Sequence, residues 1–211
     1  MKIDVKNYTK LIKKKTILDN VNISFESGKI YGLHGKNGSG KTMLLRAICG
    51  LILPTSGEVS IDGKIIGKDI EFPESVGIII ENMTMLTDYT AFDNLKILAK
   101  IKKIATDEDI RNALENVGLN PDDKKKVKAF SLGMKQKLNI AQAIMEKPKL
   151  LLLDEPTNAL DEESVKDVRK LLLEMKEQGV LIIIASHNKE DLEVLCDDLV
   201  EIYEGRIKTK A

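Results

Sequence analysis

Gly35-Lys36-Asn37-Gly38-Ser39-Gly40-Lys41-Thr42 is the stretch of sequence that decides the fold of this chain. It fits the pattern G-x-x-x-x-G-K-[ST] at every fixed position. Glycines let a backbone wrap around a phosphate and aim several N–H groups inward. The pattern requires a strand before it and a helix after it. Both are predicted, from an apolar run at Lys29–Leu33 and a helix from Lys41 to about Cys49. The stretch is therefore predicted to be a phosphate-binding loop.

Two side chains of this loop have predicted roles on a nucleoside triphosphate. Lys41 can reach the β- and γ-phosphates, and the hydroxyl of Thr42 can bind Mg²⁺. The following helix adds the positive end of its dipole at the same place. We therefore expect ATP and Mg²⁺ to bind at residues 35–42.

A second candidate site lies at the end of a buried strand. Four leucines, Leu150–Leu153, precede Asp154 and Glu155. Open α/β sheets bind ligands outside the carboxyl ends of their strands, so these acids are expected beside the phosphates. Asp154 is predicted to hold Mg²⁺, directly or through water. Glu155 is predicted to poise a water molecule against the γ-phosphate.

His187 follows another buried strand, Leu181–Ser186, and is one of two histidines in the chain. At the neighbouring strand edge, a neutral imidazole could hydrogen-bond a γ-phosphate oxygen. The other interpretation is an ordinary polar turn residue, and position alone does not outweigh it.

The remaining segments predict the fold class. Lys2–Val5, Thr16–Phe25 and a hairpin turn at Asp62-Gly63 indicate antiparallel strands early in the chain. Residues 91–117 and 131–146 are predicted to be helical. Strands then alternate with helices to the end of the chain, as in a parallel sheet.

The expected fold is α/β. It is a P-loop NTPase with a mixed central sheet, an N-terminal antiparallel β-subdomain and an inserted α-helical subdomain. We expect one domain over 1–211, with a nucleotide-binding core at 1–82 and 147–211 and the helical subdomain at 83–146. Inside that insertion, Thr106 and Asp109 form a predicted capping box, and Gly118 ends the helix that it starts.

Composition narrows the class of protein further. The 211 residues are 43% apolar, and Lys plus Arg total 33, as do Asp plus Glu. This balance does not favour nucleic acid, so no nucleic-acid partner is expected. No apolar run approaches the roughly 18 residues of a membrane span, and the N-terminus has no apolar signal segment. Cys49 and Cys196 show no metal-ligand spacing and are expected to be buried, reduced thiols. A cytoplasmic protein is therefore expected.

Four segments together resemble the ATPase subunit of an ABC transporter. In chain order these are the phosphate loop, SLGMKQ at 131–136, LLLLDEPTNALD at 150–161 and SH at 186–187. The resemblance covers essentially the whole chain. The segment 131–136 is its most specific part, because it separates this family from other P-loop ATPases. The form S-L-G-M-K-Q resembles the branch of multidrug, antibiotic-peptide and bacitracin-type exporters.

The resemblance implies roles for residues across the chain. Glu155 resembles the catalytic base of the family, and His187 resembles its switch histidine. Asp161 resembles the D-loop aspartate. Ser131 and Gly133 resemble the signature residues that close over ATP held by the opposite subunit. Taken alone, Ser131 could instead be an ordinary helix cap.

This chain departs from the family pattern at three places. In the signature, Leu132 and Met134 stand where the family has a Gly and a Gln. Glu81 stands where the family has a glutamine; an ionised Glu only accepts hydrogen bonds, and it could still bind Mg²⁺ or water. Ile12 stands where an aromatic residue stacks on adenine, with Tyr8 four residues earlier, so Ile12 would cover the base without π stacking.

The resemblance also implies partners. ATP would be hydrolysed at two composite sites in a head-to-tail homodimer or pseudo-dimer. A separate transmembrane permease, docked at Met83–Asn94, would place the chain on the inner face of the cell membrane and export a drug, peptide or lipid-like substrate. Two alternatives stay open. One is a non-transport ABC ATPase of the cytosol, such as an Fe–S assembly type. The other is a regulatory nucleotide-binding module with little turnover, which Glu81 and Ile12 would fit.

Overall fold

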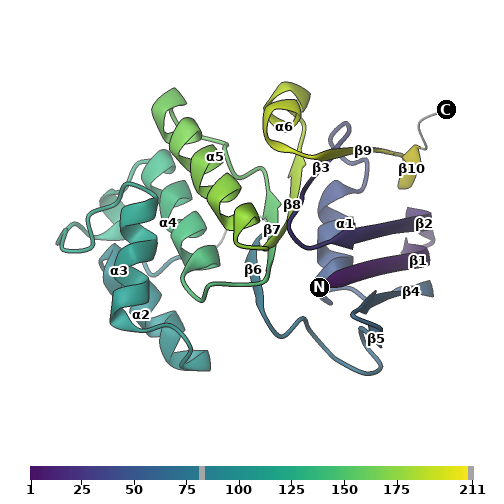
Figure 1. The fold of residues 1–211 in the computed structure, drawn as a ribbon, viewed down its shortest axis with the longest axis horizontal. Helices are drawn as coiled ribbons and strands as arrows, with labels where there is room; N and C mark the ends of the chain where they lie inside the picture. Colours follow the sequence, from purple (N-terminus) through teal and green to yellow (C-terminus); the bar gives the residue numbers. More distant parts are fainter. Residues whose placement is uncertain (81–83, 209–211) are drawn as a thin grey trace.

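Two β-sheets and the helices packed on them make up the fold (Figure 1). A computed structural model describes residues 1–80 and 84–208. Among these residues, the first sheet is antiparallel, with four strands in the order β2-β1-β4-β5, which confirms the predicted strands at the start of the chain. The bounds of these strands are β1 Lys2–Ile12, β2 Lys15–Glu26, β4 Ser56–Ile61 and β5 Lys64–Ile65.

Tight turns join neighbouring strands of this sheet. Asp62 with φ 48° and Gly63 with φ 83° link β4 to β5, which confirms the predicted hairpin. Lys13 with φ 47° and Lys14 with φ 67° link β1 to β2, although lysine is an uncommon residue at positive φ. Both turns therefore have the left-handed geometry that two-residue hairpins favour.

The second sheet carries the phosphate loop and the acidic strand end. Within the described residues its six strands lie in the order β10-β9-β3-β8-β7-β6. Neighbouring strands are parallel except for β10, which is antiparallel to β9, so the predicted mixed sheet is confirmed. The bounds are β3 Ile30–His34, β6 Val76–Ile79, β7 Leu150–Asp154, β8 Leu181–Ser186, β9 Asp198–Tyr203 and β10 Arg206–Lys208.

Helices cover both faces of this second sheet (Figure 1). Their bounds are α1 Lys41–Ile48, α2 Ala91–Lys102, α3 Asp107–Asn116, α4 Leu132–Ile144, α5 Glu162–Glu177 and α6 Lys189–Leu195, with a 3-10 turn at Val127–Ala129. The predicted helical range 91–117 holds two helices, because Lys103 with φ 56° ends α2. Thr106 and Asp109 form the predicted capping box of α3, and Gly118 follows that helix with φ 71°. Every helix in the described part of the chain falls short of the length and apolarity that a membrane span requires.

Alternate residues of β7 serve two hydrophobic clusters. Leu150 and Leu152 belong to the cluster that contains α1 and the antiparallel sheet, whereas Leu151 and Leu153 belong to the cluster formed with α2–α5. All four leucines are fully buried. An uninterrupted apolar strand is expected where both faces of a parallel sheet are covered. Burial of each side chain contributes about 1.5–3 kcal/mol to stability.

The short strand β10 forms one edge of the second sheet. Nε and Nη2 of Arg206 lie 2.9 and 2.6 Å from Oδ2 of Asp19 in β2. The amino group of Lys208 lies 2.7 Å from Oε1 of Glu201 in β9. Charged side chains therefore link this edge to the antiparallel sheet and to its neighbouring strand.

Helix α4 packs very closely on β6. A Cβ atom at Gly77 would overlap the carbonyl oxygen of Ala143, which belongs to the backbone of α4. The glycine therefore allows the helical segment to approach the sheet at this point.

Gly77→Ala should lower the free energy of unfolding by about 3 kcal/mol, because helix backbone rather than a flexible side chain must move. Gly63→Ala is the control, since a Cβ there meets nothing within 4 Å and only its positive φ costs stability, about 1 kcal/mol. Urea unfolding followed by circular dichroism measures both. Equal losses for the two variants would contradict the close packing of α4 on β6.

Both cysteines are free, and Cys49 is buried as expected while Cys196 is half-buried. Burial raises the pKa of both thiols, that of Cys196 to about 12. Because the thiolate is the reactive form, the folded chain should show almost no reaction with a disulfide reagent at about pH 8. Both thiols should react within minutes in guanidinium. Rapid modification of the folded chain would show that at least one thiol is accessible and ionised.

Candidate active site

The phosphate loop connects β3 to α1 at the carboxyl edge of the parallel strands. Gly35, Gly38 and Gly40 adopt φ angles of 152°, 78° and 114°. A Cβ atom at Gly35 would overlap the carbonyl oxygen of Ile202, so the close approach of these two backbones requires glycine. A Cβ at Gly38 would meet nothing within 4 Å, and the loop is open on that side, where Lys36 and Asn37 are accessible.

Several features of the loop suit a phosphate. The N-cap of α1 is Gly40, which supplies no side-chain hydrogen bond, so the first N–H groups of the helix can serve a ligand. Among the described residues, the buried Oγ of Ser39 has no hydrogen-bond partner. Lys41 is 6% exposed, and its amino group donates to the carbonyl oxygens of Gly35 at 2.7 Å and Lys36 at 3.3 Å. The loop therefore already holds the charge of Lys41 beside the place where a phosphate would sit.

Asp154 lies directly beside the loop. Strand register brings it there: Asp154 of β7 pairs with Ala185 of β8, and the next residue of β8, Ser186, pairs with His34 of β3. The hydroxyl of Thr42 donates a 2.6 Å hydrogen bond to Oδ2 of Asp154. The structure thus joins the loop and the acidic strand end, as the sequence predicts.

The Thr42 hydroxyl and the Asp154 carboxylate could hold a metal ion. Both supply the oxygen ligands that Mg²⁺ prefers, and Mg²⁺ usually completes its shell with waters and substrate phosphates. In residues 1–80 and 84–208, no group of three or more His, Cys, Asp or Glu could hold a metal. Because Thr42 and Asp154 supply two oxygen ligands, a magnesium ion held by them would take its other ligands from water and from phosphate oxygens.

Glu155 is fixed by the end of β8. Its φ is 50°, and its backbone N–H donates to the carbonyl oxygen of Ala185 at 2.8 Å. Oε2 accepts a hydrogen bond from Ser186 Oγ at 3.0 Å, and Oε1 accepts one from the backbone N–H of His187 at 2.9 Å. Nδ1 of His187 lies 2.7 Å from the same Oε1. Asp154, Glu155 and His187 are therefore brought together at one sheet edge.

These contacts define what the carboxylate can do. The side chain of Glu155 is 22% exposed and that of His187 is 55% exposed, so the imidazole has more room to move than the carboxylate. A carboxylate held in one orientation at the edge of a phosphate site suits a general base. If the ring of His187 turns away from it, a ring nitrogen becomes available to a phosphate oxygen.

Ser131 and Gly133 do not join the phosphate loop of their own chain. They lie at the start of α4, which packs on the opposite face of the second sheet from α1 (Figure 1). Ser131 is the N-cap of α4, and its hydroxyl accepts a 3.2 Å hydrogen bond from the backbone N–H of Met134. Ser131 is exposed, and Leu132 is 74% exposed, so this helix start faces outward.

Asp161 is the N-cap of α5. Its Oδ1 accepts a 2.8 Å hydrogen bond from the backbone N–H of Ser164. This hydrogen bond lowers the pKa of Asp161 below its usual value. The carboxylate is therefore ionised and fixed in direction at neutral pH.

The residues considered for contact with the adenine base differ in exposure. Ile12 ends β1 and is 40% exposed, so its side chain is accessible. Tyr8 is fully buried, and its hydroxyl donates to the carbonyl oxygen of Ile52 at 3.1 Å, so it belongs to the core and not to a base-binding surface. Glu81 lies outside the described residues.

Sequence reasoning missed two polar residues at this edge. Ser186 bonds the Glu155 carboxylate, and Gln136 of α4 bonds the backbone just after that carboxylate. Both lie inside segments that carry the family resemblance, 131–136 and 186–187, but nothing in those segments shows which atoms a serine at a strand end or a glutamine on a helix contacts.

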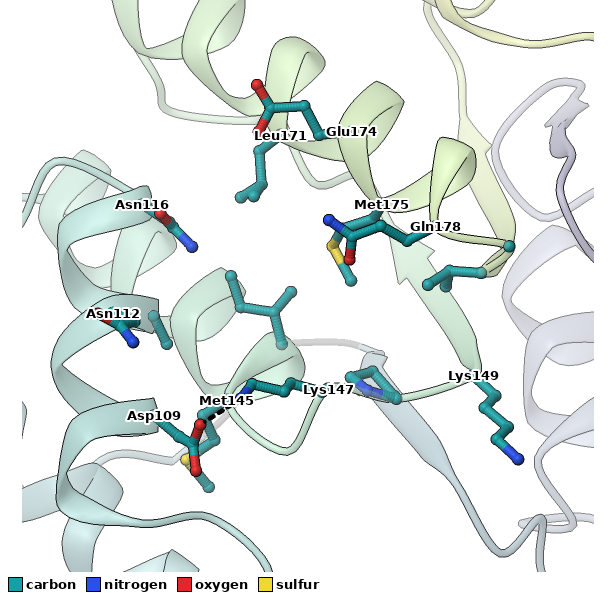
Figure 2. Close-up of a pocket in the computed structure, with 15 residues that line it drawn as sticks. Asp109, Asn112, Asn116, Met145, Lys147, Lys149, Leu171, Glu174, Met175 and Gln178 are labelled. Carbon is teal, nitrogen blue, oxygen red and sulfur yellow. Dashed lines mark ion pairs between the residues drawn. The ribbon is translucent and has the colours of Figure 1, made fainter.

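In the described part of the chain, α5 contributes to the walls of two larger cavities. One of about 500 Å³ lies between α3, the end of α4 and the end of α5, and Figure 2 shows Asn112 and Gln178 on opposite sides of it. Lys149 and Val180, which line it, precede β7 and β8, so this cavity is at the edge of the sheet opposite to Asp154. The other, about 410 Å³, is lined by Ser186 and His187, which contact Glu155.

Both the sequence and the fold are similar to those of proteins from one family. The family model described as ABC transporter matches residues 18–158. The uncharacterized ABC transporter ATP-binding protein YybJ of Bacillus subtilis (strain 168) is 60% identical over 98% of this chain and 95% of YybJ. The bacitracin transport ATP-binding protein BcrA of Bacillus licheniformis is 42% identical over 97% of this chain and 68% of BcrA. A dimeric structure of MJ0796, a bacterial ABC transporter cassette, shows the same fold with a TM-score of 0.88 at 24% identity, covering 98% of this chain and 97% of that one.

Asp154→Ala should remove most of the gain in nucleotide affinity that Mg²⁺ provides. Loss of a charged oxygen ligand is expected to cost about tenfold or more in the affinity for ATP with Mg²⁺, and little without it. Titration of a fluorescent ATP analogue with Mg²⁺ and with EDTA measures both values. Asp167→Asn, at an exposed position of α5, is the control and should match the wild type. An unchanged Mg²⁺ effect in Asp154→Ala would rule out this carboxylate as a ligand.

Proposed function

We propose a working mechanism for this chain on the premise that it belongs to the ABC transporter family, as an ATP-binding subunit and an ATPase. The observation that carries the mechanism is the contact between the phosphate loop and the acidic strand end, where Thr42 and Asp154 are hydrogen-bonded at 2.6 Å and Glu155 follows directly. Phosphoryl transfer needs positioning and charge neutralisation, and this edge supplies groups for both.

The loop residues would grip the triphosphate. In this mechanism the backbone of 35–42 wraps the β-phosphate, and Lys41 moves its hydrogen bonds from loop carbonyls to the β- and γ-phosphates. Thr42 and Asp154 would hold Mg²⁺, which neutralises charge on the phosphates when bound. Ile12 would cover the adenine by apolar contact alone.

Glu155 would act as the general base. Hydrogen bonds from Ser186 and from the backbone of His187 already fix the orientation of its carboxylate. The carboxylate can therefore accept a proton from the attacking water without first reorienting. His187 would leave the carboxylate and donate to the γ-phosphate when ATP is bound. The 2.7 Å contact between Nδ1 and Oε1 supports this exchange, because the ring already lies within reach of the catalytic edge.

Two copies of the chain would complete each site. Ser131 and Gly133 lie at the outward-facing start of α4, across the sheet from their own phosphate loop, so they are placed to serve ATP on another subunit. The N-terminal end of α4 beside them favours the binding of an anion such as a phosphate group. The dimer of MJ0796 is a property of that protein, and its fold is the same. We infer a head-to-tail dimer in which Asp161 lies at the subunit contact.

A membrane permease is the proposed partner. The segment Met83–Asn94 would dock on it; in the described part, Leu86 is 44% exposed and Tyr89 is 47% exposed, which gives this surface apolar contact area. The chain would then lie on the inner face of the cell membrane.

The helical subdomain, 83–146, would turn relative to the core formed by 1–82 and 147–211. The two parts meet where α4 packs on β6.

The proposed substrate is a drug, a peptide or a lipid-like molecule that is exported. BcrA is named for the transport of bacitracin, and its identity of 42% supports a peptide antibiotic or a similar molecule for this chain. The related proteins compared above have transporter names, which favours transport over the Fe–S assembly alternative.

Glu155→Gln should lower kcat by about 100-fold or more, because the amide cannot take a proton from water. Binding of ATP with Mg²⁺ should persist, and the variant should form a stable dimer with ATP on a sizing column. A phosphate-release assay measures the rate. Glu163→Gln, an exposed acid at the start of α5, is the matched control and should keep the wild-type rate. Hydrolysis by Glu155→Gln at the wild-type rate would exclude Glu155 as the base.

A further inference from the structure

Gln136 of α4 forms a direct link to the loop that carries Glu155. Its Nε2 donates to the carbonyl oxygen of Pro156 at 2.8 Å and lies 3.4 Å from the carbonyl oxygen of Glu155. Gln136 is half-buried and lies five residues after Ser131, on the same helix. One side chain therefore joins the helix that begins at Ser131 to the backbone of the catalytic loop.

The orientation of the Gln136 amide is fixed by its surroundings. Nδ2 of Asn139, one helical turn further along α4, donates to Oε1 of Gln136 at 3.3 Å. Asn139 is 9% exposed and belongs to the buried face of α4. Because Oε1 is engaged from one side, the NH₂ group of Gln136 faces the two carbonyl oxygens of the loop. The link is therefore directional and depends on a donor at this position.

The loop that receives this hydrogen bond holds two residues in left-handed conformations. Glu155 has φ 50° and Ala159 has φ 66°, and neither is a glycine. Such residues persist only when surrounding contacts hold them. On one side, β8 holds Glu155 through Ala185 and Ser186. On the other side, α4 holds the loop through Gln136.

A second contact joins α4 to the same loop. A Cβ atom at Gly133 would lie 2.9 Å from the carbonyl oxygen of Ala159, so the start of α4 rests against the loop backbone. The segment 131–136 thus contacts the catalytic loop at two places. A shift of the helix start relative to the sheet must move this backbone or break the hydrogen bond.

We propose that Gln136 is a positioning residue that couples the two ATP sites of the dimer. This inference rests on the proposed function, in which Ser131 and Gly133 close over ATP held by the partner subunit and Glu155 is the base for ATP held by its own subunit. When the start of α4 engages the partner's ATP, Gln136 carries that displacement to the carbonyl oxygens of Glu155 and Pro156. Occupancy of one site then sets the alignment of the base in the other, which is a coupling free energy between sites.

The test compares Gln136→Ala and Gln136→Glu with the wild-type full chain. Glu keeps the size of the side chain but loses the Nε2 donor when it is ionised. Both variants should lower kcat about tenfold, since small displacements of a catalytic group cost rate. The wild-type Hill coefficient for ATP should lie between 1 and about 2, because two sites are coupled. In both variants it should fall to about 1. The affinity of the single chain for a fluorescent ATP analogue should change by less than about twofold, because Gln136 hydrogen-bonds Glu155, Pro156 and Asn139, which lie outside the phosphate loop.

Rescue by protonation separates positioning from a merely structural role. At lower pH the carboxyl group introduced by Gln136→Glu gains a proton, and its O–H can then donate to the Pro156 carbonyl oxygen. Partial burial and the two facing carbonyl oxygens should raise the pKa of this carboxyl above the ordinary value of about 4.3 for Glu. The ratio of the kcat of Gln136→Glu to that of the wild type should therefore rise as pH falls from about 8 to about 5.5, while Gln136→Ala shows no such rise. Gln178→Ala, which removes an exposed amide at the end of α5, is the matched control and should behave as the wild type.

The outcomes separate this inference from the function on which it rests. A wild-type chain that does not hydrolyse ATP would overturn the proposed function itself. A wild-type chain that hydrolyses ATP with a Hill coefficient of about 1 would overturn coupling alone, as would Gln136 variants that keep the wild-type Hill coefficient. A lowered kcat in Gln136→Glu that does not recover with falling pH would show that the side chain only supports the local fold.

Discussion

Parallel pairing of β3, β8 and β7 is the constraint on which the whole site depends. The three strands end at one edge, and their register places His34 opposite Ser186 and Asp154 opposite Ala185. Because alternate residues of β7 pack into different clusters, a slip of one residue would exchange the two sets of leucines between the two cores. The hydrophobic packing that stabilises the sheet therefore also fixes the position of the carboxylate that meets Thr42.

At this edge of the sheet, a residue proposed for catalysis has a backbone conformation that its own type does not favour. Glu155 adopts a conformation that is unfavourable for a residue with a side chain, and contacts from β8 and α4 hold it there. The phosphate loop uses glycine for the same purpose at Gly35, where another backbone leaves no room for a Cβ atom. At Glu155 the surrounding elements, which are stabilised elsewhere, keep an unfavourable backbone in position, whereas at Gly35 the absence of a Cβ atom permits the close approach.

The features that could be predicted from sequence are those with a short-range cause. The phosphate loop, the capping box at Thr106 and the hairpin at Asp62-Gly63 each depend on a few adjacent residues, and the structure has all three. Contacts that depend on tertiary approach were not predictable: nothing near Gln136 indicates that its amide faces the carbonyl oxygens after Glu155. Tyr8 shows how an irregular strand changes an expectation, because regular alternation from Ile3 and Val5 would turn Asn7 toward the core. Instead Asn7 has φ 48° and the pairing of β1 with β2 shifts between Val5 and Tyr8, so the aromatic ring is buried in place of Asn7.

Strand β10 has a consequence for behaviour in a crowded cell. Unpaired strand edges are templates on which other chains can add strands and start aggregates. Within the described residues this edge is three residues long, and Arg206 and Lys208 place charges along it, one of them bound to Asp19 and the other to Glu201. A foreign strand would have to desolvate these ion pairs to extend the sheet. The same side chains that fasten β10 therefore also oppose the addition of another strand at this edge.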